Sequence, residues 1–285
     1  MSTDSPISHV SDTALMVAAC RALETERPDG MVRDPFARRL AGERGMAIAQ
    51  ALPDLQIMCF GVGMRSRFLD DLLKYALSTY PIEVVVSIGA GLDARPWRID
   101  LPANLRWVEV DFQDILDYKD SVIASETPKC RVERLTVDLN QPDDRQRIYS
   151  TLGGGPALMI LEGILMYLPG STVTALTAEW AAIRGPRYCL VDITSSEFTR
   201  RSRVSQLVAH VSSTTGLSGE QIYELLQGNG WVTLERRSYV QDILKTAGAR
   251  ILKIMQAQAA SGRLATPPLN DVSGVYLLGQ GAAIS

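Results

Sequence analysis

Gly89, Gly91 and Asp111 are the residues whose types and spacing first suggest chemistry. The two glycines follow the apolar run 84–88, and a glycine in such a turn lets the backbone approach a ligand without a Cβ clash. Asp111 lies 20 residues beyond Gly91, where a carboxylate that holds a ribose diol is expected. This spacing predicts a site for a nucleoside or a dinucleotide, although two glycines in a tight turn can also serve no ligand.

Further polar residues come at the ends of other apolar runs. Asp138 and Leu139 close the run that begins at residue 131, and Glu162 follows the run 157–161. In an open α/β sheet, ligands bind outside the carboxyl ends of the strands, so these residues are expected at one edge. The carboxylate of Asp138 and the amide of Leu139 suit an adenine, whereas the alternative for Asp138 is a solvated strand end.

A nicotinamide-dependent oxidoreductase is the competing prediction, because with Ala94 the turn satisfies the dinucleotide pattern G-x-G-x-x-G/A. Three features argue against it. Asp93 inside the turn would repel a pyrophosphate near the helix N-terminus, and Pro96 constrains the backbone where that helix should begin. None of the nine tyrosines is followed by lysine four positions later, so the Tyr-x-x-x-Lys pair of short-chain dehydrogenases is absent.

S-adenosylmethionine is the ligand that these residues favour. It carries a diol and an adenine, but an amino acid end takes the place of the phosphates. Its ammonium group needs carbonyl or carboxylate oxygens, and its carboxylate needs an arginine. A protein that binds this molecule without catalysis stays open as an alternative.

Six segments in order resemble the leucine carboxyl methyltransferase family, including its bacterial branch that acts on small molecules. They are "TALMVAACRALETERPDGMVRDPFARRL", "GMRSRFLDDLL", "VVVSIGAGLDARPWRI", "WVEVDFQDILDYKDSVI", "VERLTVDLNQ" and "LEGILMYLPGSTVTAL". The likeness covers about residues 12 to 245. It implies an α/β fold, the Rossmann-like, seven-stranded, mostly parallel sheet of class I methyltransferases with a helical N-terminal lid, and an enzyme similar to polyketide-tailoring carboxyl methyltransferases.

The resemblance also implies roles for individual residues. The implied cofactor-binding residues are Arg65 for the carboxylate, Gly89, Gly91 and Glu162 for the amino acid end, Asp111 for the ribose, and Asp138 and Leu139 for the adenine. Arg21 is a weaker match, expected beside the substrate or the cofactor, and its alternative is an arginine on a helix surface. Tyr167 is a weak candidate for bordering the methyl group, and its alternative is packing under a lid.

The elements that must position these residues follow from the apolar pattern. Residues 11–80 are expected to be helical, with Ser11 or Asp12 as one N-cap and Asp34, followed by Pro35, as another. Beyond residue 82, short apolar runs alternate with helix-length segments, which predicts parallel strands covered on both faces. The candidate strands are 83–89, 105–111, 131–139, 157–165, 187–193, 231–240 and 272–281.

One structural domain is expected, with a helical N-terminal lid segment at 1–81 and a methyltransferase core at 82–285 that carries a lid insertion around 194–217. Ser218 and Gln221 predict a capping box, and the glycines at 228 and 230 predict the end of that helix.

Composition narrows the class of protein. A net charge of −3 favours neither nucleic acid nor a membrane surface as a partner, and the oligomeric state is unknown. The four cysteines are far apart and there is no histidine cluster, so no metal site is predicted. Cys189 is expected to be a small core residue. With no secretion signal and no apolar stretch of about 18 residues, the expected location is cytoplasmic.

The acceptor atom is predicted from what the chain lacks. A phenol or alcohol must lose a proton during methyl transfer, which usually requires a histidine or a tuned acid. The chain has only two histidines, His9 and His210, and neither lies at a predicted strand end. Because a carboxylate is already ionised at neutral pH, the expected substrate is a small-molecule carboxylic acid and the expected product a methyl ester. A phenol or hydroxyl O-methyltransferase of secondary metabolism is the alternative.

Overall fold

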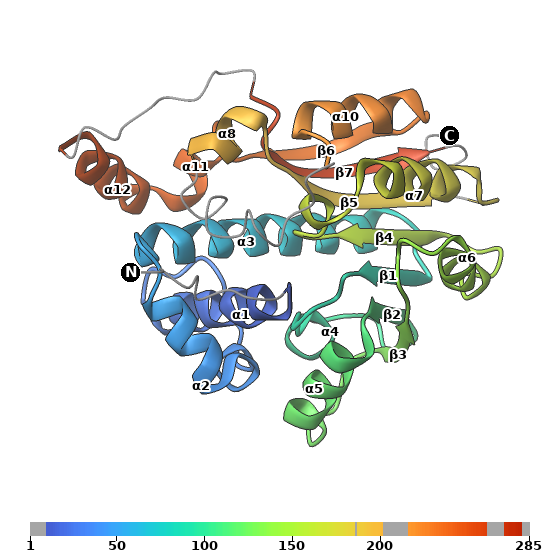
Figure 1. Cartoon of the computed structure of the whole chain (residues 1–285), viewed down its shortest axis with the longest axis horizontal. Coiled ribbons are helices and arrows are strands. Elements are labelled where there is room, and N and C mark those ends of the chain that lie inside the picture. The colour runs from blue at the N-terminus through green and yellow to red at the C-terminus, as the bar shows by residue number, and fades with distance from the viewer. Residues whose placement is uncertain (1–9, 186, 202–215, 261–270, 281–285) are drawn as a thin grey trace, which may run out of the picture.

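A seven-stranded sheet forms the centre of the molecule (Figure 1). The computed structural model describes residues 10–185, 187–201, 216–260 and 271–280. The strands follow the order β3-β2-β1-β4-β5-β7-β6, and β7 runs antiparallel to both of its neighbours. Their bounds are β1 Val84–Ile88, β2 Arg106–Asp111, β3 Arg131–Thr136, β4 Ala157–Leu161, β5 Arg187–Ile193, β6 Val232–Ser238 and β7 Gly274–Gln280. Each lies within a predicted range, so the predicted Rossmann-like α/β fold is confirmed.

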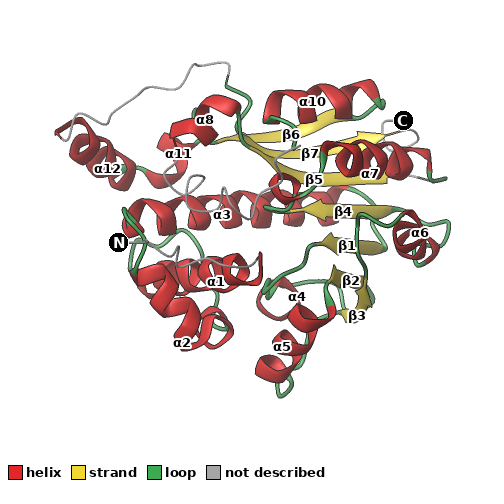
Figure 2. Ribbon diagram, viewed as in Figure 1, coloured by secondary structure: helices red, strands yellow, loops and turns green. Residues whose placement is uncertain are grey.

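Helices cover both faces of this sheet (Figure 2). Those of the described residues are α1 Val10–Glu26, α2 Ala37–Gln50, α3 Leu55–Thr79, α4 Arg95–Arg98, α5 Gln113–Ile123, α6 Pro142–Ser150, the 3-10 turn η1 Leu165–Tyr167, α7 Gly170–Ala182, α8 Ser196–Arg201, α10 Gly219–Gly228, α11 Ile243–Ala247 and α12 Ala249–Ala260. None of them combines the length and the apolar composition that crossing a bilayer requires.

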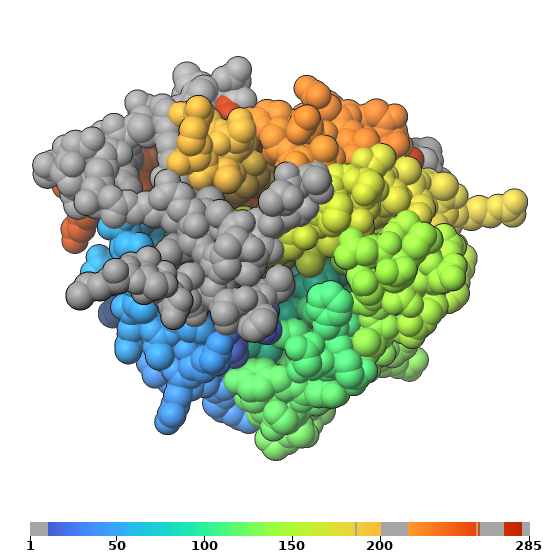
Figure 3. Space-filling view, viewed as in Figure 1, coloured from blue at the N-terminus to red at the C-terminus, as the bar shows by residue number. Residues whose placement is uncertain are grey.

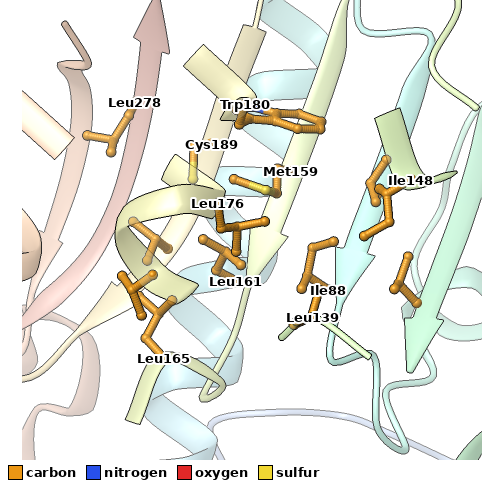
Figure 4. Close-up of a cluster of buried hydrophobic side chains, with 14 of the residues drawn as sticks. Ile88, Leu139, Ile148, Met159, Leu161, Leu165, Leu176, Trp180, Cys189 and Leu278 are labelled. Carbon is orange, nitrogen blue, oxygen red and sulfur yellow. The ribbon is translucent and has the colours of Figure 1, made fainter. Parts of the chain in front are cut away.

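Two apolar clusters hold the layers together. Successive residues of β1 and β4 are buried, because both faces of these central strands pack against helices. The cluster on one face joins the strands to α6 and α7 and includes Met159, Leu176 and Trp180 (Figure 4). Cys189 lies in this cluster with no exposed surface, which confirms it as a small core residue. The cluster on the other face packs α3 against the sheet through Phe68 and its apolar neighbours.

The direction of β7 determines where the last connection of the chain lies. Since β7 is antiparallel to β5 and to β6, the strand β6 runs parallel to β5. The carboxyl end of β6 and the amino end of β7 therefore lie at the edge where β1 to β5 end. The chain therefore leaves β6 and enters β7 at this edge, and α11 and α12, which follow β6, lie on the same side of the sheet (Figure 1).

Helix ends agree with the sequence in one place and differ in two. Ser218 and Gln221 form the predicted capping box of α10. Neither Ser11 nor Asp12 caps α1, because the helix already includes Val10 and Asp12 lies in its first turn. Asp34 is not the N-cap of α2 either: the cap is Phe36, and the Asp34 carboxylate accepts the Phe36 N–H at 3.1 Å in the turn before the helix.

The N-terminal segment contains three helices, α1 to α3. In Figure 3 its blue surface meets the green surface of α5, where the Tyr118 hydroxyl donates to the Leu40 carbonyl at 3.0 Å. The helix α3 belongs to segment 1–81, but it packs on the sheet and forms part of the layer that covers one face. The boundary at residue 81 and a lid role stay predictions, and much of the predicted insertion 194–217 lies outside the described residues.

Candidate active site

A cavity of about 1190 Å³ lies at the carboxyl ends of the strands. Its wall combines the turn after β1, the residues at the ends of β2, β4, β5 and β6, and parts of α1 and α3. The predicted site residues that line it are Arg21, Arg65, Gly89, Gly91, Asp111, Glu162 and Tyr167. Of the residues predicted at strand ends, Gly89, Gly91, Asp111 and Glu162 thus share one cavity, and the contacts that the predicted site residues make with a ligand stay predictions.

The turn after β1 depends on both of its glycines. Gly89 and Gly91 have φ values of 62° and 48°, in the left-handed region that residues with a side chain rarely adopt. A Cβ atom at Gly89 would lie 2.5 Å from the Cδ1 atom of Ile164. The turn thus passes close to the chain that follows β4 and leaves its own backbone on the cavity wall.

Asp111 supports this turn from the neighbouring strand. Its Oδ2 accepts the Gly91 N–H at 2.7 Å, and its Oδ1 accepts the Phe112 N–H at 2.8 Å. Burial raises the pKa of Asp111 above its ordinary value, although both backbone hydrogen bonds act to lower it. Each carboxylate oxygen keeps a lone pair beyond these bonds, so Asp111 can position the turn and accept from a ligand diol as well.

Glu162 receives two guanidinium groups at the end of β4. Arg65 donates from Nε to Oε1 at 3.0 Å, and Arg95 donates from Nη1 to Oε2 at 2.6 Å. Burial acts to raise the pKa of Glu162, but the charges of Arg95 and Arg65 outweigh it and hold that pKa below its ordinary value. Glu162 is therefore a carboxylate that fixes Arg65 at the cavity wall.

Arg95 is a residue that the sequence reasoning missed; it is not among those that line the cavity, but it pairs with Asp93 and Glu162, which are. Its side chain is 2% exposed and also donates to Asp70 at 2.7 Å and to Asp93 at 2.9 Å. Burial would raise the pKa of Asp93, but Arg95 and the other nearby cations lower it to about 2. The carboxylate that the sequence placed in the turn is thus neutralised by the arginine two positions later, and that short spacing was the available signal.

Arg21 is buried and does not lie on a helix surface, so the alternative for this residue is wrong. Its Nε donates to Asp34 at 3.0 Å, and its Nη2 donates to the Leu92 carbonyl at 2.6 Å. Through these bonds α1 holds the glycine turn from the N-terminal side. Tyr167 is half-buried in η1 and lines the cavity, and burial raises the pKa of its hydroxyl although a hydrogen bond with Thr13 lowers it.

Asp138 and Leu139 follow β3 and are not among the residues that line the cavity. Asp138 Oδ1 accepts the backbone N–H of Asn140 at 3.0 Å and its side-chain amide at 3.1 Å. The side chain of Leu139 packs in the core (Figure 4), and its carbonyl accepts from Arg145 at 2.8 Å. In this structure Asp138 forms a local turn, and the assignment of both residues to an adenine stays a prediction.

Comparison with known families shows which family this chain belongs to. The family model described as leucine carboxyl methyltransferase matches residues 14–181, more than half of the chain. The chain belongs to the leucine carboxyl methyltransferase family.

Curated relatives agree with this membership, and a solved structure shares the fold. A Streptomyces avermitilis protein, provisionally named an S-adenosyl-L-methionine-dependent methyltransferase, is 39% identical over 61% of this chain and 65% of its own length. The match thus spans just under two thirds of that relative. A Rhodococcus jostii protein with the same provisional name is 31% identical over 78% of this chain and 79% of its own length. A DUF574 protein structure from Streptomyces avermitilis shares the fold, with a TM-score of 0.61 and 14% identity over 93% of this chain and 97% of that chain.

Two further residues of the cavity lie beyond the part that the family model matches. Asp192, at the end of β5, lies with its Oδ2 3.7 Å from Arg65, and its Oδ1 accepts the Gly163 N–H at 2.6 Å. Burial raises the pKa of Asp192. Tyr239 directly follows β6. The strand-end rule was applied to the first four strands only, and extending it to strands five and six would have found both residues.

The described residues of the chain hold neither a histidine nor a cluster of metal ligands. No group of three His, Cys, Asp or Glu side chains within the described ranges could hold a metal ion. His9 and His210 both lie outside the part of the chain that the structure describes, so their predicted lack of a catalytic role stays a prediction.

Proposed function

We propose that this chain transfers a methyl group from S-adenosylmethionine to an oxygen atom, and that the oxygen belongs to a carboxylate of a small natural product. Membership of the leucine carboxyl methyltransferase family supports the reaction class. The cofactor assignment rests on one observation: two opposite charges lie on one cavity wall. Asp111 offers a carboxylate at the end of β2, and Arg65 offers a guanidinium that Glu162 orients.

These charges match the two ends of S-adenosylmethionine. Asp111 would accept from the ribose hydroxyls, while Arg65 would hold the carboxylate of the methionine portion with paired N–H donors. The glycine turn would let the cofactor lie against backbone. The donor, when bound, supplies a methyl group on a positively charged sulfur. The protein has then to hold the acceptor oxygen about 3 Å from that carbon and keep water away.

The preference for a carboxylate rests on the proton balance. A carboxylate attacks without losing a proton, so no base is needed, and histidine is scarce in the chain. A hydroxyl acceptor is the second candidate, and one observation favours it. Asp192 lines the cavity as a buried carboxylate with a raised pKa, which is the kind of group that can take a proton from a hydroxyl.

The stability of the product to alkali separates these candidates. The enzyme is incubated with methyl-labelled S-adenosylmethionine and an extract of natural-product acids, and the labelled product is treated with mild alkali. A methyl ester releases labelled methanol, and the variants His9→Ala and His210→Ala are expected to keep most of the turnover. A label that survives as an ether contradicts the carboxylate assignment. Binding of S-adenosylhomocysteine without transfer to any acceptor would instead point to a binding protein.

A further inference from the structure

The cavity extends beyond the residues that are predicted to bind the cofactor. Ligand sites in proteins usually have volumes of about 300 to 1000 Å³, so about 1190 Å³ leaves room for a second molecule beside a nucleoside. Gly91 and Asp111 mark one end of the cavity, next to β1 and β2. We call the opposite end, beyond β5, the acceptor end; it is formed by Asp192, Phe198, Tyr239, Ile243, Ile251 and Ile254.

Tyr239, which lines this end, carries a hydroxyl without a partner in the described part of the chain. Its Oη atom is buried and has no hydrogen-bond partner among the residues that the structure describes. Its ring stacks on Phe68 at 5.9 Å between centroids and lies 6.0 Å from the ring of Phe198, so the side chain is held in place. Other buried polar atoms without partners occur in the described chain, but none of the residues that carry them lines the cavity.

A buried hydroxyl without a partner is costly, and such groups are rare unless a ligand or a water completes them. Tyr239 and Asp192 both line this end of the cavity, and Asp192 lies 3.7 Å from Arg65. Burial raises the pKa of the Tyr239 hydroxyl well above its ordinary value, so it keeps its proton and can only be a neutral donor or acceptor at working pH.

The rest of the acceptor end is mainly apolar. Phe198 comes from α8, Ile243 from α11, and Ile251 and Ile254 from α12, while Phe60 of α3 lines the cavity from the sheet side. Arg250 of α12 covers the Phe60 ring at 4.9 Å and donates to Glu24 of α1 at 2.7 Å. These two contacts of Arg250 fix α12 against the N-terminal helices α1 and α3, so the apolar wall is held in place by the fold.

We propose that the acceptor end binds a carboxylic acid with an apolar body, whose carboxylate accepts a hydrogen bond from the Tyr239 hydroxyl. This inference rests on the proposed function, because it names the acceptor for the same cavity. One carboxylate oxygen would attack the methyl carbon, the carbon–sulfur bond would break with its electron pair on sulfur, and no proton would be released. The second oxygen, which becomes the ester carbonyl, is the one that Tyr239 would hold.

This role predicts an effect on acceptor binding more than on turnover. The hydrogen bond is made to the carboxylate before reaction and weakens when the charge disappears in the ester, so it orients the acceptor rather than stabilising the product. Hydrogen bonds to a charged group contribute enough for their loss to raise a dissociation constant about ten-fold or more. Tyr239→Phe keeps the stacked ring and removes only the hydroxyl.

The experiment measures binding of octanoate and 3-phenylpropionate to the protein saturated with S-adenosylhomocysteine, using isothermal titration. The wild-type protein is expected to bind both probes, and to bind neither succinate nor octylammonium. Tyr239→Phe is expected to bind the two acids about ten-fold more weakly, with its affinity for S-adenosylhomocysteine within two-fold and its unfolding midpoint unchanged or raised. Tyr118→Phe, which removes another tyrosine hydroxyl away from the cavity, should bind the acids like the wild type.

A second pair of variants tests the apolar wall on one helix. Ile254 lines the cavity and is half-buried, whereas Leu252 is 52% exposed on the same helix. Ile254→Glu should abolish octanoate binding, and Leu252→Glu should leave it unchanged. The proposal is overturned if the wild type binds neither apolar acid, or if Tyr239→Phe and Ile254→Glu both bind octanoate normally.

Loss of S-adenosylhomocysteine affinity in Tyr239→Phe would also overturn the proposal, because it would place the hydroxyl on the cofactor. Methyl transfer to the bound acids is followed in parallel. If the acids bind through Tyr239 and receive no methyl group, the proposed function fails while the acceptor-end assignment stands.

Discussion

Arg65 and Glu162 show how single residues prepare the site for a charged ligand. Glu162 already holds the Arg65 guanidinium at 3.0 Å, so the arginine is oriented before a cofactor arrives. A side chain that is ordered in advance loses less conformational entropy on binding, which favours affinity. The Nη donors of Arg65, of which Nη1 lies 3.7 Å from Asp192, are therefore the expected contact for the cofactor carboxylate.

The first prediction concerns this contact. Arg65→Lys should weaken S-adenosylhomocysteine binding at least about ten-fold, because an ammonium cannot make the paired bonds of a guanidinium to a carboxylate. Adenosine lacks that carboxylate, so its affinity should hardly change. Isothermal titration with both ligands tests this, and equal losses for the two would place Arg65 elsewhere.

Asp111 gives a second prediction at this scale. Asp111→Asn keeps a carbonyl oxygen for the glycine turn but removes the charge that ribose hydroxyls would use, so S-adenosylhomocysteine should bind about ten-fold to one hundred-fold more weakly. Asp117→Asn, a change on the exposed side of α5, is the matched control. Unchanged affinity in a folded Asp111→Asn protein would remove the ribose assignment.

Asp93 connects the site to the pH dependence of stability. Its pKa falls from 3.8 to about 2 in the folded protein, so its ionised form stabilises the fold at every pH above its unfolded pKa, and this contribution is lost as the pH falls toward 2. The shift corresponds to about 2 kcal/mol at neutral pH.

The third prediction is that Asp93→Asn is less stable than the wild type by this amount at pH 6 and by roughly half of it at pH 3. Urea unfolding at both values measures the difference. Arg95 keeps Asp70 and Glu162 as partners, so the variant should still fold. Asp71→Asn, in an exposed pair with Arg67, provides the control. A difference that does not shrink with pH would contradict the role of this carboxylate.

Residues that depend on local spacing were predictable, and residues that depend on distant partners were not. Gly89, Gly91 and Asp111 could be found because a turn and a strand end are visible within a few residues of sequence. Arg95 acquires its role only because α3 and β4 bring Asp70 and Glu162 to it, and a single sequence does not show which distant carboxylates will meet an arginine.

At the scale of elements, the strands followed from their composition. The run of β-branched residues in β1 and the continuous apolar run in β4 left little alternative for these strands, because every position in both is buried. Helix starts were less certain. Asp34 has the chemistry of an N-cap, but its carboxylate also serves the buried Arg21, and the helix begins three residues later.

The ion pair between Glu24 of α1 and Arg250 of α12 gives the fourth prediction. The Glu24 side chain has no exposed surface, and that of Arg250 is 9% exposed. Removing one member of a buried pair leaves the other unpaired, so Arg250→Leu should lower the free energy of unfolding by about 3 kcal/mol. Lys253→Leu, an exposed change on the same helix, should alter it by less than about 0.5 kcal/mol. Denaturant unfolding measures both, and equal effects would show that α12 is not held by this contact.

At the scale of the whole molecule, ligand binding should be visible as stability. A ligand at about 100 times its dissociation constant adds about 2.7 kcal/mol to the free energy of unfolding. The fifth prediction is that S-adenosylhomocysteine raises the unfolding midpoint, whereas NAD and NADP leave it unchanged because the ionised Asp93 lines the cavity and would repel a pyrophosphate. An unfolding midpoint that rises with NADP and not with S-adenosylhomocysteine would restore the oxidoreductase alternative.

The architecture as a whole was more predictable from the sequence than the acceptor end of the cavity. Alternating strands and helices specify a doubly covered sheet, and the comparison structure shares that fold. The connection after β6 has no comparable pattern, since α11 and α12 are shaped by their contacts with Phe60, Glu24 and the sheet edge.

The reversed direction of β7 also has a consequence for how such proteins diversify. Because the connection between β6 and β7 begins and ends at one edge of the sheet, it can be exchanged, lengthened or shortened without altering the register of any strand that carries a predicted cofactor contact. One hairpin connection can therefore acquire a new specificity by drift or by grafting, while the strands that carry the predicted cofactor contacts are inherited unchanged.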